Sequence, residues 1–181
     1  MKSKTKKIRL DIGCGKKKKD GFIGLDMADY RKLYKKDEFI RHDLNKGLPF
    51  ADGSVDEIYS EDCIEHLHLN SRYPIVAIMD ELWRVCKPGA RVKLIVPFAL
   101  SASNFNNPTH INNFLPETFK YFTKDGFEWD KYTTKFWKII KLRLTPPRAL
   151  RFIKLPELFK IIGFFIPSVI SSIEIELVKL K

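Results

Sequence analysis

Cysteine is scarce in this sequence, and no apolar run is long enough to cross a membrane. The three cysteines, Cys14, Cys63 and Cys86, are an odd number without CxxC spacing, so the sequence indicates neither a disulfide framework nor a structural zinc site. The apolar run at 161–166 ends at Pro167, far short of the roughly 20 residues of a membrane span. The basic N-terminus is followed by a charged, glycine-broken segment, unlike the apolar core of an export signal. We therefore expect a cytoplasmic protein that needs no metal ion.

Acidic residues are fewer than basic ones, 22 against 33, which gives a net charge of +11. The excess lies at the two ends, because residues 1–20 carry +7 and residues 131–181 carry +8, whereas residues 21–130 carry −4. Basic ends are typical of contacts with nucleic acid, anionic lipid or an anionic substrate. Lysine-rich surfaces are also common without any partner, and we take this simpler interpretation for the lysines at 16–19.

The 181 residues, 44% of them hydrophobic, are enough to bury a core, and we expect a single domain over 1–181. The pattern predicts helices over 73–87 and 116–124, and strands over 8–12, 22–25, 38–44, 55–60, 91–97, 135–144 and 173–179. Only six residues, 16–21, follow the first glycine turn before the second strand, so we expect an irregular loop there in place of a helix. The order of elements predicts an α/β domain whose site lies along the C-terminal edge of its sheet.

The stretch from residue 8 to residue 26 has the pattern of a nucleoside site. An apolar strand ends in Gly13-Cys14-Gly15, and the next strand ends in Asp26. Glycine permits a positive φ and a close approach of backbone to ligand, and a carboxylate at the tip of the second strand can accept both hydroxyls of a ribose. A Gly-x-Gly alone is more often only a tight turn, so this hypothesis needs support from the rest of the chain.

Asp43 stands at the end of the third predicted strand. A polar residue at this position can meet a ligand, and its carboxylate could accept from an adenine amino group. The alternative is that Asp43 caps the turn at 45–47, Asn-Lys-Gly, which is turn chemistry by itself. Both interpretations stay open at this point.

Five segments together resemble one family, the Rossmann-like S-adenosylmethionine-dependent methyltransferases of the type 11 group. They are LDIGCG at 10–15, GLD at 24–26, HDL at 42–44, LPFADGSVDEIYSEDCIEHL at 48–67 and ELWRVCKPGARVKLIVP at 81–97. The resemblance covers about half of the chain. It implies a mostly parallel sheet with an antiparallel seventh strand, here with a shortened first crossover, and S-adenosyl-L-methionine as cofactor.

The resemblance also implies a role for individual residues. The cofactor's methionine part would be surrounded by Asp11, Gly13, Cys14 and Gly15, and its methionyl end would also meet Glu61. Its ribose would be bound by Asp26, with Met27 beside it, and its adenine by Asp43 and Leu44. The family's usual third glycine is replaced by lysine in Lys16-Lys17, which leaves the arrangement around the amino-acid end open.

Two histidines are candidates for a catalytic base. His66 follows the fourth predicted strand, and His110 lies in a loop after the fifth. Histidine can take a proton near neutral pH, although a structural hydrogen bond is an equally ordinary role for each ring. In relatives, a segment like the one at 108–114 belongs to a substrate-side loop.

The function implied is methyl transfer to a small-molecule, glycan or lipid-linked acceptor. An apolar, basic stretch at 148–168, within a helical insert expected at 145–172, would be a peripheral membrane anchor or a lid over such an acceptor; a lid packed on the sheet or on a second subunit is the alternative.

A nucleic-acid methyltransferase and a non-catalytic cofactor-binding subunit remain as alternatives. We do not expect nucleic acid, because residues 60–63 lack the N/D-P-P-Y/F sequence of base-methylating relatives. A nicotinamide enzyme is disfavoured, since Asp26 follows Gly13 by 13 residues instead of roughly 20.

Overall fold

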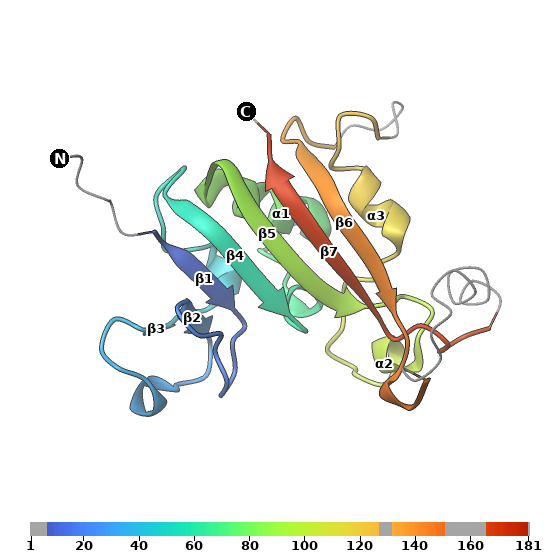
Figure 1. Cartoon of the computed structure of the whole chain (residues 1–181), viewed down its shortest axis with the longest axis horizontal. Coiled ribbons are helices and arrows are strands. Elements are labelled where there is room, and N and C mark those ends of the chain that lie inside the picture. Colours follow the sequence, from blue (N-terminus) through green and yellow to red (C-terminus); the bar gives the residue numbers. More distant parts are fainter. Residues whose placement is uncertain (1–6, 127–131, 151–165, 181) are drawn as a thin grey trace.

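The computed structural model describes residues 7–126, 132–150 and 166–180, whose strands form one seven-stranded sheet (Figure 1). The strands are β1 Arg9–Ile12, β2 Ile23–Asp26, β3 Phe39–Arg41, β4 Val55–Glu61, β5 Cys86–Pro97, β6 Trp137–Thr145 and β7 Ser172–Lys179. The α-helices are α1 Pro74–Val85, α2 Ala102–Phe105 and α3 Pro116–Lys120. Short 3₁₀ turns are η1 Arg31–Leu33, η2 Leu44–Lys46, η3 Ile64–His66 and η4 Arg148–Leu150.

The strand order across the sheet is β3-β2-β1-β4-β5-β7-β6. The pairs from β3 through β5 are all parallel, whereas β7 lies antiparallel between β5 and β6. This arrangement confirms the predicted α/β fold with its antiparallel seventh strand. Because β1, β2, β3 and β4 run the same way, their C-terminal ends, where the candidate residues lie, share one edge of the sheet.

The connection from β1 to β2 is the shortened crossover that the sequence predicts. Residues 13–22 form turns and no helix. The amide of Lys19 donates to Asp11 Oδ2 at 2.6 Å, which ties the loop back to the strand that it leaves. The connections from β2 to β3 and from β3 to β4 contain only the short turns η1 and η2.

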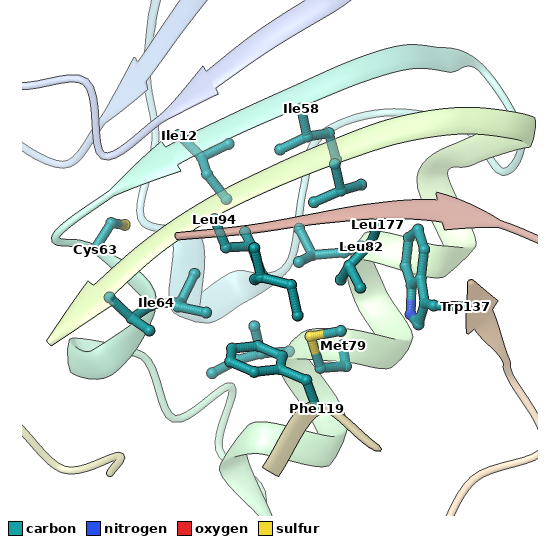
Figure 2. Packing of buried hydrophobic residues seen from close by; sticks show 14 of the residues in the cluster. Ile12, Ile58, Cys63, Ile64, Met79, Leu82, Leu94, Phe119, Trp137 and Leu177 are labelled. Atoms are coloured by element: carbon teal, nitrogen blue, oxygen red, sulfur yellow. The ribbon is translucent and has the colours of Figure 1, made fainter. Parts of the chain in front are cut away.

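One face of the sheet is covered by α1 and α3 and holds the hydrophobic core. Alternate residues of β5 and β7, such as Leu94 and Leu177, are fully buried on this face. Figure 2 shows Met79 and Leu82 of α1 and Phe119 of α3 gathered against them. The buried residues of α1 recur at helical spacing, which turns one stripe of the helix to the sheet.

The opposite face carries charged side chains and no described helix. Lys93 on β5 pairs with Glu174 on β7 at 2.7 Å, and Lys141 on β6 reaches Glu174 at 3.5 Å and Glu176 at 3.3 Å. Figure 1 views the sheet from this face, with α1 and α3 behind it. We call it the open face. Ion pairs across neighbouring strands suit a sheet surface that meets water, so this face is stable without helical cover.

Helix α1 ends earlier than the sequence suggests. We expect the helix to reach residue 87 and to stop at Pro88-Gly89, whereas it ends at Val85. Cys86 already pairs with Val55, so β5 begins there. Gly89, with a φ of +79°, lies inside β5 between two register positions and accommodates the irregularity.

The insert expected at 145–172 is described only at its ends. Residues 148–150 form η4, and the amide of Ser171 donates to the carbonyl of Thr145 at 2.8 Å, which brings the two ends together. The helices expected within 151–165 lie outside the described residues. Among the described helices, none has the length and apolar character of a membrane span.

Candidate functional site

The C-terminal ends of β1 to β4 surround a cavity of about 290 Å³, which we call the glycine-turn cavity. Five residues predicted to bind the cofactor line it: Gly13, Asp26, Met27, Asp43 and Leu44. The remaining lining residues are Asn45, Asp62, Cys63, His66 and Leu67. Residues from four separate strand ends thus meet around one hollow.

Gly13 forms the wall of this cavity where the chain leaves β1. Its φ is +69°, and its amide donates to the carbonyl of Leu25 at 2.8 Å. A Cβ at this position would lie 2.4 Å from both Cβ and Sγ of Cys63. Only glycine therefore fits, because a side chain here would both strain the backbone and collide with the segment after β4.

Asp26 holds the turn in place from the end of β2. Its Oδ2 accepts from the amide of Gly15 and its Oδ1 from the amide of Ala28, both at 2.9 Å. Each carboxylate oxygen keeps a second lone pair, so Asp26 can still accept from a ligand hydroxyl. The backbone contacts fix the carboxylate in one orientation toward the cavity.

Asp43 combines the two roles that the sequence left open. Its Oδ1 accepts from the amide of Asn45 at 3.0 Å, so it caps η2. Asp43 and Leu44 also line the glycine-turn cavity. The capping role and contact with a ligand are therefore compatible.

Three residues of the predicted cofactor site, Asp11, Cys14 and Gly15, do not line the glycine-turn cavity. Asp11 is buried under the loop after β1, and this burial raises the pKa of its carboxyl. Cys14 Sγ would be 2.7 Å from a Cβ at Gly24, so it packs against β2, and burial raises the pKa of its thiol to about 12. These residues shape the turn, and a direct role for them stays a prediction.

A second and larger cavity, of about 640 Å³, adjoins the first, and we call it the histidine cavity. It lies at the ends of β4 and β5 and the start of β7, and it is lined by Glu61, Asp62, Glu65, His66, Ile95, Pro97, Ser103, Asn107, His110, Pro147, Arg148, Ser171 and Ser172. Asp62 and His66 line both cavities. The predicted residues Glu61, His66 and His110 are thus brought together here, with the hydroxyl of Tyr59 donating to Glu61.

Glu65 and Asp62 are acidic cavity residues that sequence reasoning missed. Glu65 is fully buried, and burial raises the pKa of its carboxyl to about 7. Burial likewise raises the pKa of Asp62, whose φ of +48° turns the chain sharply at the end of β4. Three acids within residues 61–65, directly after a strand, were the available signal.

Glu65, His66 and His110 form one cluster, although 43 residues or more separate His110 from the other two. The Nε2 atoms of both histidines lie 3.9 Å from Glu65 Oε1, and the ring centroids are 4.7 Å apart. Asn112 holds the two segments together, because its buried amide donates to the carbonyls of Ile64 at 3.0 Å and Leu67 at 2.7 Å.

The comparisons with known proteins point to one family. A family model described as a methyltransferase domain matches residues 10–94. No curated protein matches the chain significantly.

Several solved structures share the fold at low sequence identity. A SAM-dependent methyltransferase from Archaeoglobus fulgidus is 18% identical with a TM-score of 0.65, covering 96% of this chain and 86% of its own. The putative methyltransferase in complex with the Trm112 activator from Haloferax volcanii is 16% identical with a TM-score of 0.62, covering 100% and 86%. Phosphoethanolamine N-methyltransferase 2 from Haemonchus contortus, bound to S-adenosyl-L-methionine, is 17% identical with a TM-score of 0.62, covering 99% of this chain and 50% of its own.

Proposed function

We propose that this protein methylates a hydroxyl group of a small-molecule, glycan or lipid-linked acceptor. The chain belongs to the class I S-adenosylmethionine-dependent methyltransferases of the type 11 group. The observation that carries this proposal is the junction of the two cavities at Asp62 and His66. One cavity suits a nucleoside, and the other offers space and proton acceptors for a second reactant. Small-molecule sites usually have volumes of roughly 300–1,000 Å³. The histidine cavity, at about 640 Å³, is within this range, and the glycine-turn cavity, at about 290 Å³, is close to its lower end.

The residues of the glycine-turn cavity fit the cofactor of this family. The bare backbone at Gly13 admits a ligand where any side chain would collide with Cys63. Asp26 can accept from ribose hydroxyls, while Leu44 and Leu67 offer apolar contact to an adenine ring. When bound, the cofactor supplies an electrophilic methyl group on a sulfonium.

The histidine cavity supplies groups that can take the proton of an acceptor hydroxyl. His110 Nδ1 lies 2.9 Å from the carbonyl of Asn104, so this nitrogen carries the hydrogen and Nε2 keeps its lone pair. His110 Nε2 and Glu65 both line the cavity. We assign the proton-accepting role to His110, with His66 as the alternative, because holding the acceptor and removing its proton is what the protein must add to the cofactor's chemistry.

The rim of the histidine cavity supports a lipid-linked or otherwise apolar acceptor. Phe105 is 73% exposed and Ile166 is 53% exposed. Phe105 lies between Ser103 and Asn107, which line the cavity. The segment of Ile166 is held beside it, because Ser168 Oγ accepts from the amide of Ala102 at the start of α2. Exposed side chains of this size often mark a contact with another apolar surface.

Cofactor binding is tested by calorimetry with S-adenosyl-L-methionine on the full chain. We expect micromolar binding that Asp26→Ala weakens by about tenfold or more, since an acceptor of ribose hydroxyls is lost. Asp29→Ala is the matched control, because Asp29 is paired with the exposed Arg31 and lies outside the cavity. A wild-type chain that binds no cofactor would overturn the proposal.

Acceptor class is tested with isotope-labelled cofactor and pooled acceptors. Free glycans, a lipid extract and total RNA are offered separately, and the labelled product is treated with alkali, which leaves ethers intact and cleaves esters. We expect alkali-stable label in the glycan or lipid pool, with the label lost in His110→Ala. Label confined to RNA, or to an alkali-labile product, contradicts hydroxyl methylation of these acceptors.

A further inference from the structure

The carboxylate of Glu65 is buried and accepts no hydrogen bond from any described residue. The residue is 0% exposed, and neither carboxylate oxygen has a hydrogen-bond partner among the residues that the structure describes. Burial of such a group costs several kcal/mol unless something compensates it, by roughly the scale of charged-group desolvation. Glu65 is nevertheless one of the residues that line the histidine cavity.

The two histidines present unprotonated nitrogens to this carboxylate. His110 Nδ1 lies 2.9 Å from the carbonyl of Asn104, which can only accept. His66 Nδ1 lies 3.2 Å from the carbonyl of Thr109 and 2.9 Å from Thr109 Oγ1, whose own hydrogen goes to Asn107 Oδ1 at 2.7 Å. Both Nδ1 atoms therefore donate outward, and both Nε2 lone pairs face Glu65.

This hydrogen-bonding pattern is the one that ligating histidines usually have. In metal sites the second ring nitrogen donates to a backbone carbonyl or a carboxylate, which fixes the tautomer and the ring orientation. Here the carbonyls of Asn104 and Thr109 play that part. The Nε2 atoms stand 3.9 Å from Glu65 Oε1, too far for a hydrogen bond between them.

We propose that Glu65, His66 and His110 bind one divalent transition-metal cation, with its open coordination positions toward the histidine cavity. One ligand atom from each residue lies within 4.8 Å of the other two. Ligands at about 2.0–2.2 Å around a tetrahedral ion are about 3.4 Å apart. The two 3.9 Å separations from Glu65 Oε1 therefore need to close by about half an ångström, and the separation between the two histidines, which is at most 4.8 Å, by about 1.4 Å at most. Small side-chain rotations are enough for that.

The donor set decides which cations fit. Two imidazole nitrogens and one carboxylate suit zinc, cobalt or iron, whereas magnesium and calcium prefer oxygen ligands. Glu61 and Asp62 line the same cavity and add negative charge, whereas Arg148 is the one Lys or Arg among its described lining residues. The amides of Ile111 and Asn112 both donate to the carbonyl of Glu65, at 2.9 and 3.0 Å, so the backbone holds the ligands together before an ion arrives.

Cation binding deepens the proposed function, and its role in catalysis rests on that function. An ion at this position would hold an acceptor hydroxyl and lower its pKa. His66 and His110 would then be ligands, and a ligating nitrogen has no lone pair left for the proton. Activity that survives chelation would leave the histidines as bases; activity that needs the cation would make them ligands.

The test is direct binding of Zn²⁺ and Co²⁺ to the chelator-treated full chain, by calorimetry and by the visible absorption of Co²⁺, with Mg²⁺ as comparison. We expect one ion per chain, and affinity reduced at least about tenfold in Glu65→Gln and in His110→Ala. His68→Ala is the control for surface histidines, since His68 lies outside the cluster, and it should bind like the wild type. Circular dichroism checks that each variant is folded, and His66→Ala replaces any variant that is not.

Two results would overturn the cation site: no binding by the wild type, or equal affinity in the wild type, Glu65→Gln and His110→Ala. S-adenosyl-L-methionine binding is measured on the same samples. Cofactor binding without cation binding refutes the cation site and leaves the methyltransferase proposal intact. Cation binding without cofactor binding refutes the methyltransferase proposal and leaves the cation site intact.

Discussion

The two faces of the sheet are stabilised by different interactions, hydrophobic burial on one and ion pairs on the other. On the covered face, Leu94 and its neighbours are fully buried under α1 and α3. On the open face, Lys93, the residue directly before Leu94, pairs with Glu174 in contact with water. The same strand thus contributes a core residue and a solvated ion pair one position apart, because successive side chains of a strand point to opposite faces.

This difference explains how a short chain completes a mostly parallel sheet. Parallel sheets normally have helices on both faces, which the crossovers supply. Here the crossovers between β1 and β4 are loops and 3₁₀ turns, so no described helix reaches the open face. Charged pairs between strands take the place of that cover, and the stability of the fold should depend almost entirely on the covered face.

The largest effect is expected in the core of the covered face. Leu94→Ala should lower the free energy of unfolding by about 3 kcal/mol, since it deletes a fully buried side chain and leaves a cavity under α1. Urea denaturation followed by circular dichroism measures this. A loss under about 1 kcal/mol would mean that the covered face is not the main source of stability.

Gly13 tests the point where the covered core meets the glycine-turn cavity. Gly13→Ala should cost about 2–4 kcal/mol and abolish cofactor binding, because the added methyl meets Cys63 at 2.4 Å with φ at +69°. Gly15→Ala is the matched control: its φ is +55°, but nothing lies within 4 Å of its Cβ, so only backbone strain of about 1 kcal/mol is expected. Equal losses in the two variants would contradict the role of the Cys63 contact.

Arg84 tests the edge of the covered face, where α1 meets the loop after η2. Its guanidinium donates to Glu81 at 2.7 Å and to the carbonyls of Leu48 and Phe50 at 3.1 and 3.0 Å. Arg84→Met should cost about 2 kcal/mol at pH 7, since these acceptors lose their donor. Arg31→Met, which breaks only a surface pair with Asp29, is the control and should leave the unfolding midpoint unchanged.

The same variant has a characteristic pH dependence. Burial acts to raise the pKa of Glu81, but the hydrogen bonds from Arg84 and from the amide of Leu48 outweigh it and hold the pKa below its ordinary 4.5. A lowered carboxyl pKa stabilises the folded state above pH 4.5, and this contribution is lost as the pH falls through the folded-state value. The gap in unfolding free energy between wild type and Arg84→Met should therefore narrow from pH 6 to pH 3. A constant gap would exclude this linkage.

The smallest effect is expected on the open face. Lys93→Ala breaks the pair with Glu174, yet Lys141 also reaches this carboxylate and both lysines are partly exposed. We expect a loss under about 1 kcal/mol, which shrinks further in high salt. Comparing Lys93→Ala with Leu94→Ala in one denaturation series measures the two faces directly. Similar losses of unfolding free energy in the two variants would mean that the two faces contribute equally to stability.

The elements that could be predicted are those with local signals. The alternation in residues 173–179 predicts β7, and the apolar spacing of residues 73–87 predicts α1 to within two residues at its end. Gly13, Asp26 and Asp43 were predicted as a group because glycine and acids at strand tips have a recognised chemistry, and they do surround one cavity. Asp11, Cys14 and Gly15 belong to the same motif but pack into the turn, which their residue types do not reveal.

The amino-acid sequence by itself determined the strands, their buried faces and the glycine turn, because these follow from the spacing of apolar residues and from backbone permissiveness over a few positions. Only the tertiary structure decided that Glu65 would be buried with no hydrogen bond from a described residue. It also decided that His110, 45 residues further along, would face Glu65 beside His66. That meeting depends on how the segment after β5 folds back onto η3 through Asn112. Contacts between distant segments depend on the whole packing of the chain, and no local pattern encodes them.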